Sequence, residues 1–160
     1  MRIAIVCLGN ICRSPMAETV AATLVEKAGL AGSVRVESFG TAGYHIGDPA
    51  DPRGDAALAR GGWPPRRHKV RQLTAADVAG ADLVLCADRA NLAAVRRLAG
   101  EGVGRSSKVR LLRSYDSLAT PGDDEVPDPY HGADAEFDAT LAIIERSCRR
   151  LVDDLADARR

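Results

Sequence analysis

Short apolar runs alternate with segments of helical periodicity along this chain, and this alternation restricts the possible fold more than any other feature. Four runs have the length and composition of buried strands: 2–7, 34–39, 82–86 and 108–112. Helical patterns are expected between and after them, near 14–28, 53–61, 89–99 and 134–158, with a short helical turn at 74–77. Strands that alternate with helices predict an α/β fold, in which a parallel sheet carries helices on both faces.

Composition limits both size and partners. The 160 residues are 46% hydrophobic, which predicts a single domain over 1–160 with a core that needs no disulfide bonds. Basic and acidic residues balance at 22 each, and this balance argues against a nucleic-acid-binding surface. No apolar run approaches the ~20 residues that span a membrane, and no signal-peptide pattern is visible at the N-terminus. We therefore expect a cytoplasmic protein whose four cysteines are free thiols.

Parallel sheets bind ligands beyond the carboxyl ends of their strands, so the loops after each strand are the candidate functional segments. In this chain they are 8–13, 40–52, 87–89 and 113–133. The last is about 20 residues long with no predicted structure of its own, and such loops are often functional.

The first of these loops has the pattern Cys, five residues, Arg, Ser, from Cys7 to Arg13 and Ser14. A tight loop that leads into a helix directs several backbone N–H groups at one point, where a phosphate group fits. Arg13 can bind two phosphate oxygens with its planar guanidinium. The same positive field would favour a Cys7 thiolate, the nucleophilic form of cysteine. We expect Ser14 to cap the following helix, with Pro15 at its first helical position, and to donate a hydrogen bond to the thiolate.

Five segments together resemble the low-molecular-weight protein tyrosine phosphatases of the bacterial type. The nucleophile-loop signature is VCLGNICRSPMAE at 6–18, and the loop after the second strand is SFGTAGYHIG at 38–47. HKVRQ at 68–72, DRANL at 88–92 and DPY at 128–130 follow in the family's order. The resemblance extends along nearly the whole chain.

This resemblance implies a flavodoxin-like sheet of four parallel strands in the order 2-1-3-4. It implies a protein-tyrosine phosphatase that works through a cysteinyl-phosphate intermediate, with no metal and no organic cofactor. Cys7 would be the nucleophile, Arg13 would bind the phosphate and Asp128 would be the general acid. The expected partners are phosphotyrosine-containing proteins, and phosphate-like oxyanions are expected to inhibit.

The remaining site residues fall into three groups. Most line the phosphate-binding loop: Leu8, Gly9, Asn10, Ile11, Cys12 and Ser14. Tyr44 and Tyr130 lie on different loops at the carboxyl edge and can enclose a flat substrate ring. In the similar family the residue that matches Asn10 ties the loop to a serine and a histidine, which would be Ser38 and His68 here. His131 follows Tyr130 where many relatives carry a second aromatic residue.

The acid cannot be chosen from the residues alone. Asp-Pro occurs three times in carboxyl-edge loops, at Asp48, Asp51 and Asp128, and it is a common turn dipeptide. Only the likeness of 128–130 to the family's Asp-Pro-Tyr selects Asp128.

The other cysteines have separate interpretations. Cys12 follows Cys7 by five residues, but no further cysteine or histidine pair has the spacing to complete a metal site. In the similar family the second loop cysteine can pair with the nucleophile and protect it from oxidation. Cys86 and Cys148 are expected to be small core residues.

Three other functions remain open. An arsenate reductase coupled to thioredoxin shares this type of loop, but it would need a second cysteine pair near the third strand, where only Cys86 occurs. A phosphate-binding module would not require both Cys7 and an acid. A protein-arginine phosphatase would carry threonine where this chain has Ile11.

Overall fold

A parallel sheet forms the centre of the molecule. The computed structural model describes residues 1–104 and 106–159, and its strands are β1 (Arg2–Cys7), β2 (Arg35–Gly40), β3 (Leu83–Cys86) and β4 (Val109–Leu111). They pair in the order β2-β1-β3-β4, and every pairing is parallel. The predicted four-stranded sheet in the order 2-1-3-4 is confirmed.

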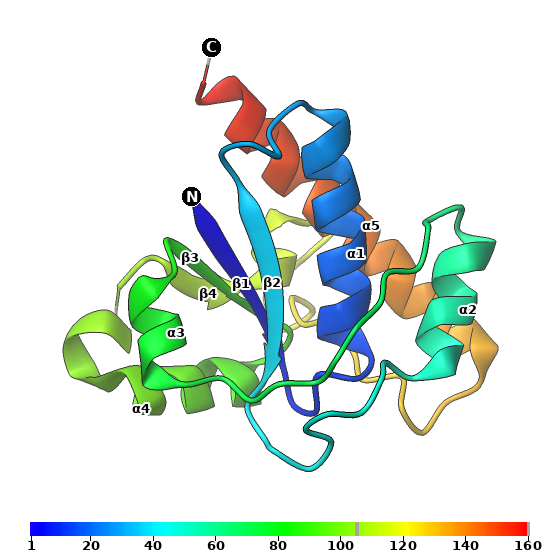
Figure 1. Ribbon diagram of the computed structural model, residues 1–160, viewed down its shortest axis with the longest axis horizontal. Helices are drawn as coiled ribbons and strands as arrows, with labels where there is room; N and C mark the ends of the chain where they lie inside the picture. The colour runs from blue at the N-terminus through cyan, green and yellow to red at the C-terminus, as the bar shows by residue number, and fades with distance from the viewer. Residues whose placement is uncertain (105, 160) are drawn as a thin grey trace.

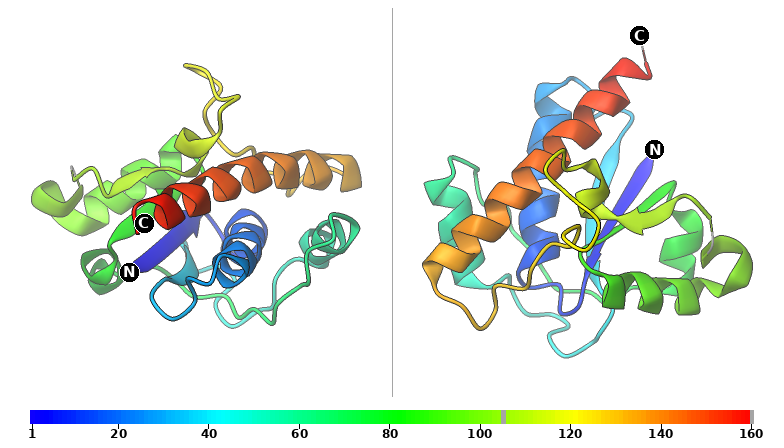
Figure 2. Two further views of the ribbon diagram at one scale, coloured as in Figure 1. Left: turned by 90° about the horizontal axis from the view of Figure 1, so that it is seen from above. Right: turned by 180° about the vertical axis from the view of Figure 1, so that it is seen from behind.

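Helices cover both faces of this sheet. They are α1 (Arg13–Lys27), α2 (Pro52–Arg60), α3 (Ala75–Gly80), α4 (Arg89–Gly104) and α5 (Asp134–Asp157). Alternate residues of β1 divide the core, because Ile3 and Ile5 pack with α1, α2 and α5, whereas Ala4 and Val6 pack with α3 and α4. Figure 1 shows α1 and α5 together on one side of the strands and α3 and α4 on the other. The right-hand view of Figure 2 shows α5 crossing the molecule diagonally.

The first helix begins two residues earlier than predicted. Its N-cap is Cys12, which makes no side-chain capping bond, so the expectation that Ser14 caps the helix is wrong. Pro15 is tolerated inside the first turn because its missing N–H group would have had no partner within the helix. The Ser14 hydroxyl is thus available for the loop, where it lies 3.0 Å from the Cys7 sulfur.

The sequence predicted no secondary structure in the long loop before α5, and this prediction is wrong. A 3-10 helix, η1 (Leu112–Tyr115), occupies its start. Arg113 then braces the loop through Asp116, Asp123 and the carbonyl oxygen of Glu125. The Asp116 side chain is buried, and its pKa is lowered chiefly by the hydrogen bond from Arg146 of α5. These charged pairs fix the loop against α5.

Backbone contact joins the end of β2 to the loop after β1. Cys7 pairs with Gly40, and a Cβ atom at position 40 would lie only 2.8 Å from the carbonyl oxygen of Leu8. The same glycine accepts a hydrogen bond from Leu73 N–H and donates one to the Arg71 carbonyl. The connection from α2 to α3, which crosses α1 in Figure 1, therefore ends against this point.

Within the described residues, no helix is both long enough and apolar enough to cross a membrane.

Candidate active site

Cys7 ends β1 at the carboxyl edge of the sheet, and its side chain is buried. The Asn10 backbone N–H group donates a hydrogen bond to Cys7 Sγ at 3.2 Å. Ser14 Oγ lies 3.0 Å from the same sulfur. Two hydrogen-bonding groups, one from the loop and one from the first helical turn, therefore converge on the sulfur.

Asn10 holds the loop in shape. Its φ is 57°, and it is the one non-glycine residue with positive φ among those the structure describes. Its side-chain Nδ2 donates to Ser14 Oγ at 2.9 Å and to Ser38 Oγ at 3.0 Å. Its Oδ1 accepts from the Arg71 backbone N–H at 3.1 Å. One buried amide thus connects the loop to α1, to β2 and to the connection before α3.

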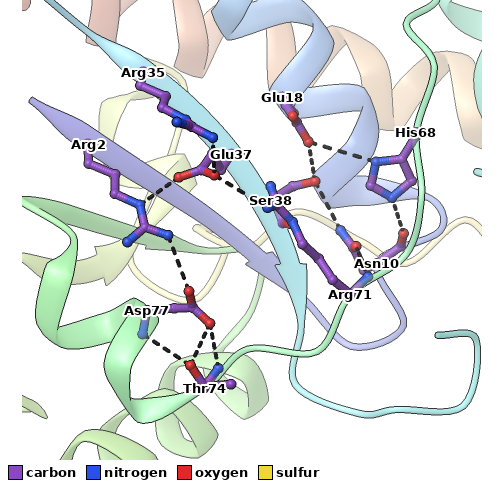
Figure 3. Close-up of polar contacts among 10 residues, drawn as sticks. All are labelled: Arg2, Asn10, Glu18, Arg35, Glu37, Ser38, His68, Arg71, Thr74 and Asp77. Carbon is purple, nitrogen blue, oxygen red and sulfur yellow. Dashed lines mark hydrogen bonds and ion pairs between the residues drawn. The ribbon is translucent and has the colours of Figure 1, made fainter. Parts of the chain in front are cut away.

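Ser38 and His68 lie beside Asn10, where the resemblance had placed them, and Glu18 joins them (Figure 3). His68 Nε2 donates to the Asn10 carbonyl oxygen at 2.8 Å, and His68 Nδ1 lies 3.9 Å from Glu18 Oε2. Ser38 Oγ donates to the same Glu18 oxygen. Sequence reasoning missed Glu18, although its position four residues after Ser14 places both residues on one side of α1.

Arg13 is buried below the mouth of the site, and its guanidinium is held by acceptors from two distant segments. Nη1 donates to Asp88 Oδ2 at 2.7 Å and to the Val126 carbonyl oxygen at 3.1 Å. Nη2 donates to Asp128 Oδ2 at 3.3 Å. Asp88 follows β3 in a loop that had been singled out by position, but its contact with Arg13 had not been predicted.

The three Asp-Pro aspartates have different surroundings. Asp128 is half-exposed, reaches Arg13 and accepts a hydrogen bond from the Tyr130 N–H at 3.1 Å. Asp48 is exposed and lies 3.3 Å from His45 Nδ1. Asp51 is the N-cap of α2. Of the three Asp-Pro aspartates, Asp128 is therefore the one that reaches the arginine of the nucleophile loop.

A pocket of about 240 Å³ opens above Cys7. Most of its lining comes from the nucleophile loop and the loops after β2 and before α5: Cys7, Leu8, Gly9, Ile11, Cys12, Arg13, Tyr44, His45, Asp128, Tyr130 and His131. The ring of Tyr130 meets His131 edge-on, with centroids 5.0 Å apart. Tyr44 is far more exposed than Tyr130, at 78% against 41%. On one side of the pocket, the Tyr130 ring is therefore supported by His131, whereas on the other side Tyr44 projects into solvent.

All four cysteines are free thiols, and their surroundings differ. Cys12 Sγ donates to Asp51 Oδ2 at 3.8 Å, and burial together with the Asp51 charge raises the pKa of Cys12 to about 12. Burial also raises the pKa values of Cys86 and Cys148 to about 12. In residues 1–104 and 106–159, no group of three or more histidine, cysteine or acidic side chains could hold a metal ion.

The fold and this pocket define an α/β protein in which a cysteine at the end of the first strand, a buried arginine and an aspartate line one pocket. The family model for low molecular weight phosphotyrosine protein phosphatase matches residues 2–160. The chain belongs to this family of protein-tyrosine phosphatases, which are phosphoric monoester hydrolases.

The sequences of individual relatives align with almost the whole chain. A low molecular weight protein-tyrosine-phosphatase of Streptomyces coelicolor is 45% identical over 151 residues, which cover 94% of this chain and 91% of the relative. A human low molecular weight phosphotyrosine protein phosphatase is 39% identical over 148 residues, with 92% and 91% covered. The crystal structure of a protein tyrosine phosphatase from Entamoeba histolytica, with Hepes in the active site, superposes with a TM-score of 0.90 at 28% identity, covering 100% of this chain and 99% of the other.

Proposed function

We propose that the chain hydrolyses phosphotyrosine in proteins through a cysteinyl-phosphate intermediate on Cys7. The observation that supports this most directly is the position of Cys7 Sγ. It lies within hydrogen-bonding distance of Asn10 N–H and Ser14 Oγ, and the buried Arg13, paired with Asp128, lines the same pocket. A nucleophile, an anion-binding group and a proton donor thus face one small cavity.

In the first step the Cys7 thiolate attacks phosphorus and the bond from phosphorus to the tyrosine oxygen breaks. Asp128, in its protonated form, gives its proton to the departing phenolate. Arg13 binds the equatorial phosphate oxygens together with the loop N–H groups, as negative charge spreads over those oxygens. For this to occur, the Arg13 Nη2 bond to Asp128 must give way to a bond to phosphate.

In the second step water attacks the cysteinyl-phosphate, and Asp128, now a carboxylate, accepts a proton from that water. The sulfur–phosphorus bond breaks, the Cys7 thiolate is restored and inorganic phosphate is released. The Ser14 hydroxyl, 3.0 Å from Cys7 Sγ, stabilises the departing thiolate by a hydrogen bond. All positive charge that this route needs comes from Arg13 and the backbone, so the proposal requires no metal or organic cofactor.

Several features of the pocket favour phosphotyrosine. The aromatic ring of Tyr130 provides an apolar wall for a phenyl ring. Ile11 lines the same pocket and disfavours a polar guanidinium, which argues against phosphoarginine as the preferred substrate.

Cys86 is fully buried with a raised pKa, so it is poorly suited to the thiol relay of an arsenate reductase. We propose a cytoplasmic enzyme that phosphate-like oxyanions inhibit.

The test is turnover of an aryl phosphate by the wild type and by Cys7→Ser, with a metal chelator present and with arsenate reduction assayed in parallel. We expect no turnover by Cys7→Ser, with phosphate binding retained because the loop and Arg13 hold the anion. Activity of the variant within about tenfold of the wild type would rule out the cysteinyl route. Intact-mass measurement after rapid acid quenching should detect the phosphorylated wild-type enzyme.

A further inference from the structure

Arg53 lies in the first turn of α2, outside the lining of the pocket, yet its side chain connects the two loops that form the site. We propose that Arg53 is a positioning residue that holds the loop carrying Asp128 and Tyr130 against the nucleophile loop during proton transfer. This inference rests on the proposed role of Asp128 as general acid.

Toward the acid loop and the start of α5, Arg53 makes one hydrogen bond and two cation–π contacts. Its Nη1 donates to the Gly132 carbonyl oxygen at 3.3 Å. Its guanidinium carbon lies 5.4 Å from the centre of the Tyr130 ring and 4.7 Å from that of Phe137, close enough for cation–π attraction to both. The Tyr130 N–H group in turn donates to Asp128. Arg53 therefore contacts the aromatic wall and the segment that follows the acid.

Toward the nucleophile loop, Arg53 acts through Asp51. Its Nε donates to Asp51 Oδ1 at 3.1 Å and its Nη2 donates to Oδ2 at 2.7 Å, which is a two-pronged pair. The Asp51 backbone N–H donates to the Ile11 carbonyl oxygen at 2.8 Å, and its carboxylate accepts the Cys12 S–H at 3.8 Å. A continuous chain of contacts thus joins the nucleophile loop to the acid loop without passing through Arg13.

This second connection matters because the first one involves a reacting group. In the structure Arg13 holds the acid loop through the Val126 carbonyl oxygen and through Asp128 itself. Binding of phosphate takes Arg13 Nη2 away from Asp128, so that hydrogen bond cannot orient the acid when the proton moves. The contacts of Arg53 include no reacting atom and persist through both steps. Proton transfer needs donor and acceptor within hydrogen-bonding reach, so a loosened loop slows this step selectively.

The experiment compares kcat/KM for a series of aryl phosphates whose leaving phenols range from nitrophenol to tyrosine. Arg53→Met keeps an apolar stem beside Tyr130 and Phe137 but removes the charge and the hydrogen bonds. Arg60→Met is the matched control, because Arg60 also lies on α2 and bridges to the C-terminal part of the chain, at Asp138 of α5, with bonds of 3.0 and 2.8 Å. Asp128→Ala provides the reference for complete loss of the acid.

For Arg53→Met we expect about a tenfold larger loss with phosphotyrosine than with nitrophenyl phosphate, since an activated phenolate leaves without a proton. Arg60→Met should lose stability at most, and any accompanying loss of kcat/KM should be the same for every substrate. Melting temperatures of both variants separate a folding defect from a positioning defect. If Arg53→Met does not fold, Arg53→Lys decides, because lysine keeps the charge but cannot make the two-pronged pair with Asp51; it should show the same trend more weakly.

Two results would overturn the inference. One is a uniform loss across the series in a folded Arg53 variant, and the other is no loss at all, while Asp128→Ala shows the steep dependence on the leaving group. If Asp128→Ala itself showed no such dependence, the assignment of the acid would have failed instead. The two failures are therefore distinguishable in one set of measurements.

Discussion

Replacing Asn10 is the most direct test of how the nucleophile loop is held. Asn10→Ala removes the two hydrogen bonds donated to Ser14 and Ser38 and the one accepted from Arg71 N–H. The two serine hydroxyls keep other partners, at Cys7 and Glu18, so each lost bond should cost only about 1 kcal/mol. Alanine at φ 57° adds about 1 kcal/mol of backbone strain. We therefore expect a loss of about 4 kcal/mol in the free energy of unfolding.

Asn10→Gly separates the two contributions. Glycine loses the same three hydrogen bonds but adopts positive φ without strain, so it should be about 1 kcal/mol more stable than Asn10→Ala. Urea denaturation of the three proteins measures both differences. Both variants should also lose about 10²-fold in kcat/KM, because the residue 10 N–H group no longer points reliably at Cys7 Sγ. Stability of Asn10→Ala within about 0.5 kcal/mol of the wild type would refute this account of the loop.

Three further substitutions test the proposed chemistry. Arg13→Lys should reduce kcat/KM by about 10³-fold, because an ammonium group cannot bind two phosphate oxygens at once. Near-normal steady-state rates in this variant would show that Arg13 does not bind the phosphate. Asp128→Ala should slow phosphotyrosine turnover by about 10²–10⁴-fold and nitrophenyl phosphate turnover far less, with Asp48→Ala as the unaffected control. Peroxide should form a Cys7–Cys12 disulfide in the wild type, so added thiol should restore its activity, whereas Cys12→Ser should stay inactive. Intact mass and activity measure this recovery, and full recovery of Cys12→Ser would contradict the protective role of Cys12.

The sequence predicted best what depends on local spacing. Cys7 and Arg13 lie in one strand–loop–helix unit, so their separation along the chain determines that both face one pocket. The strand order was implied by family resemblance and is confirmed. Ser14 shows where capping preferences fail as a guide. Serine strongly prefers the N-cap position, but the Ser14 hydroxyl lies against the Cys7 sulfur instead. Local capping preference is worth only about 1 kcal/mol, and the loop geometry outweighs it here.

What the sequence did not reveal depends on contacts between distant segments. Asp88 is 75 residues from Arg13, and Gly132 is 79 residues from Arg53, so no spacing rule relates them. Asp51 illustrates the consequence for experiment. By sequence it is an Asp-Pro aspartate equivalent to Asp48, and either residue would serve as a control for Asp128. In the fold it caps α2 and pairs with Arg53, so its removal would disturb the site, and only Asp48 remains a suitable control.

Gly40 limits how this enzyme can be redesigned. The walls of the pocket are side chains on open loops, such as Tyr44 and His131, and exchanging them changes the shape of the entrance. The floor is different, because the Leu8 carbonyl oxygen occupies the space that any side chain at position 40 would need. An exhaustive substitution library should therefore tolerate only glycine at position 40, while Gly32, where an added Cβ meets nothing within 4 Å, accepts alanine. Substrate range can evolve at the rim of this pocket, and the backbone contact below it keeps the chemistry constant.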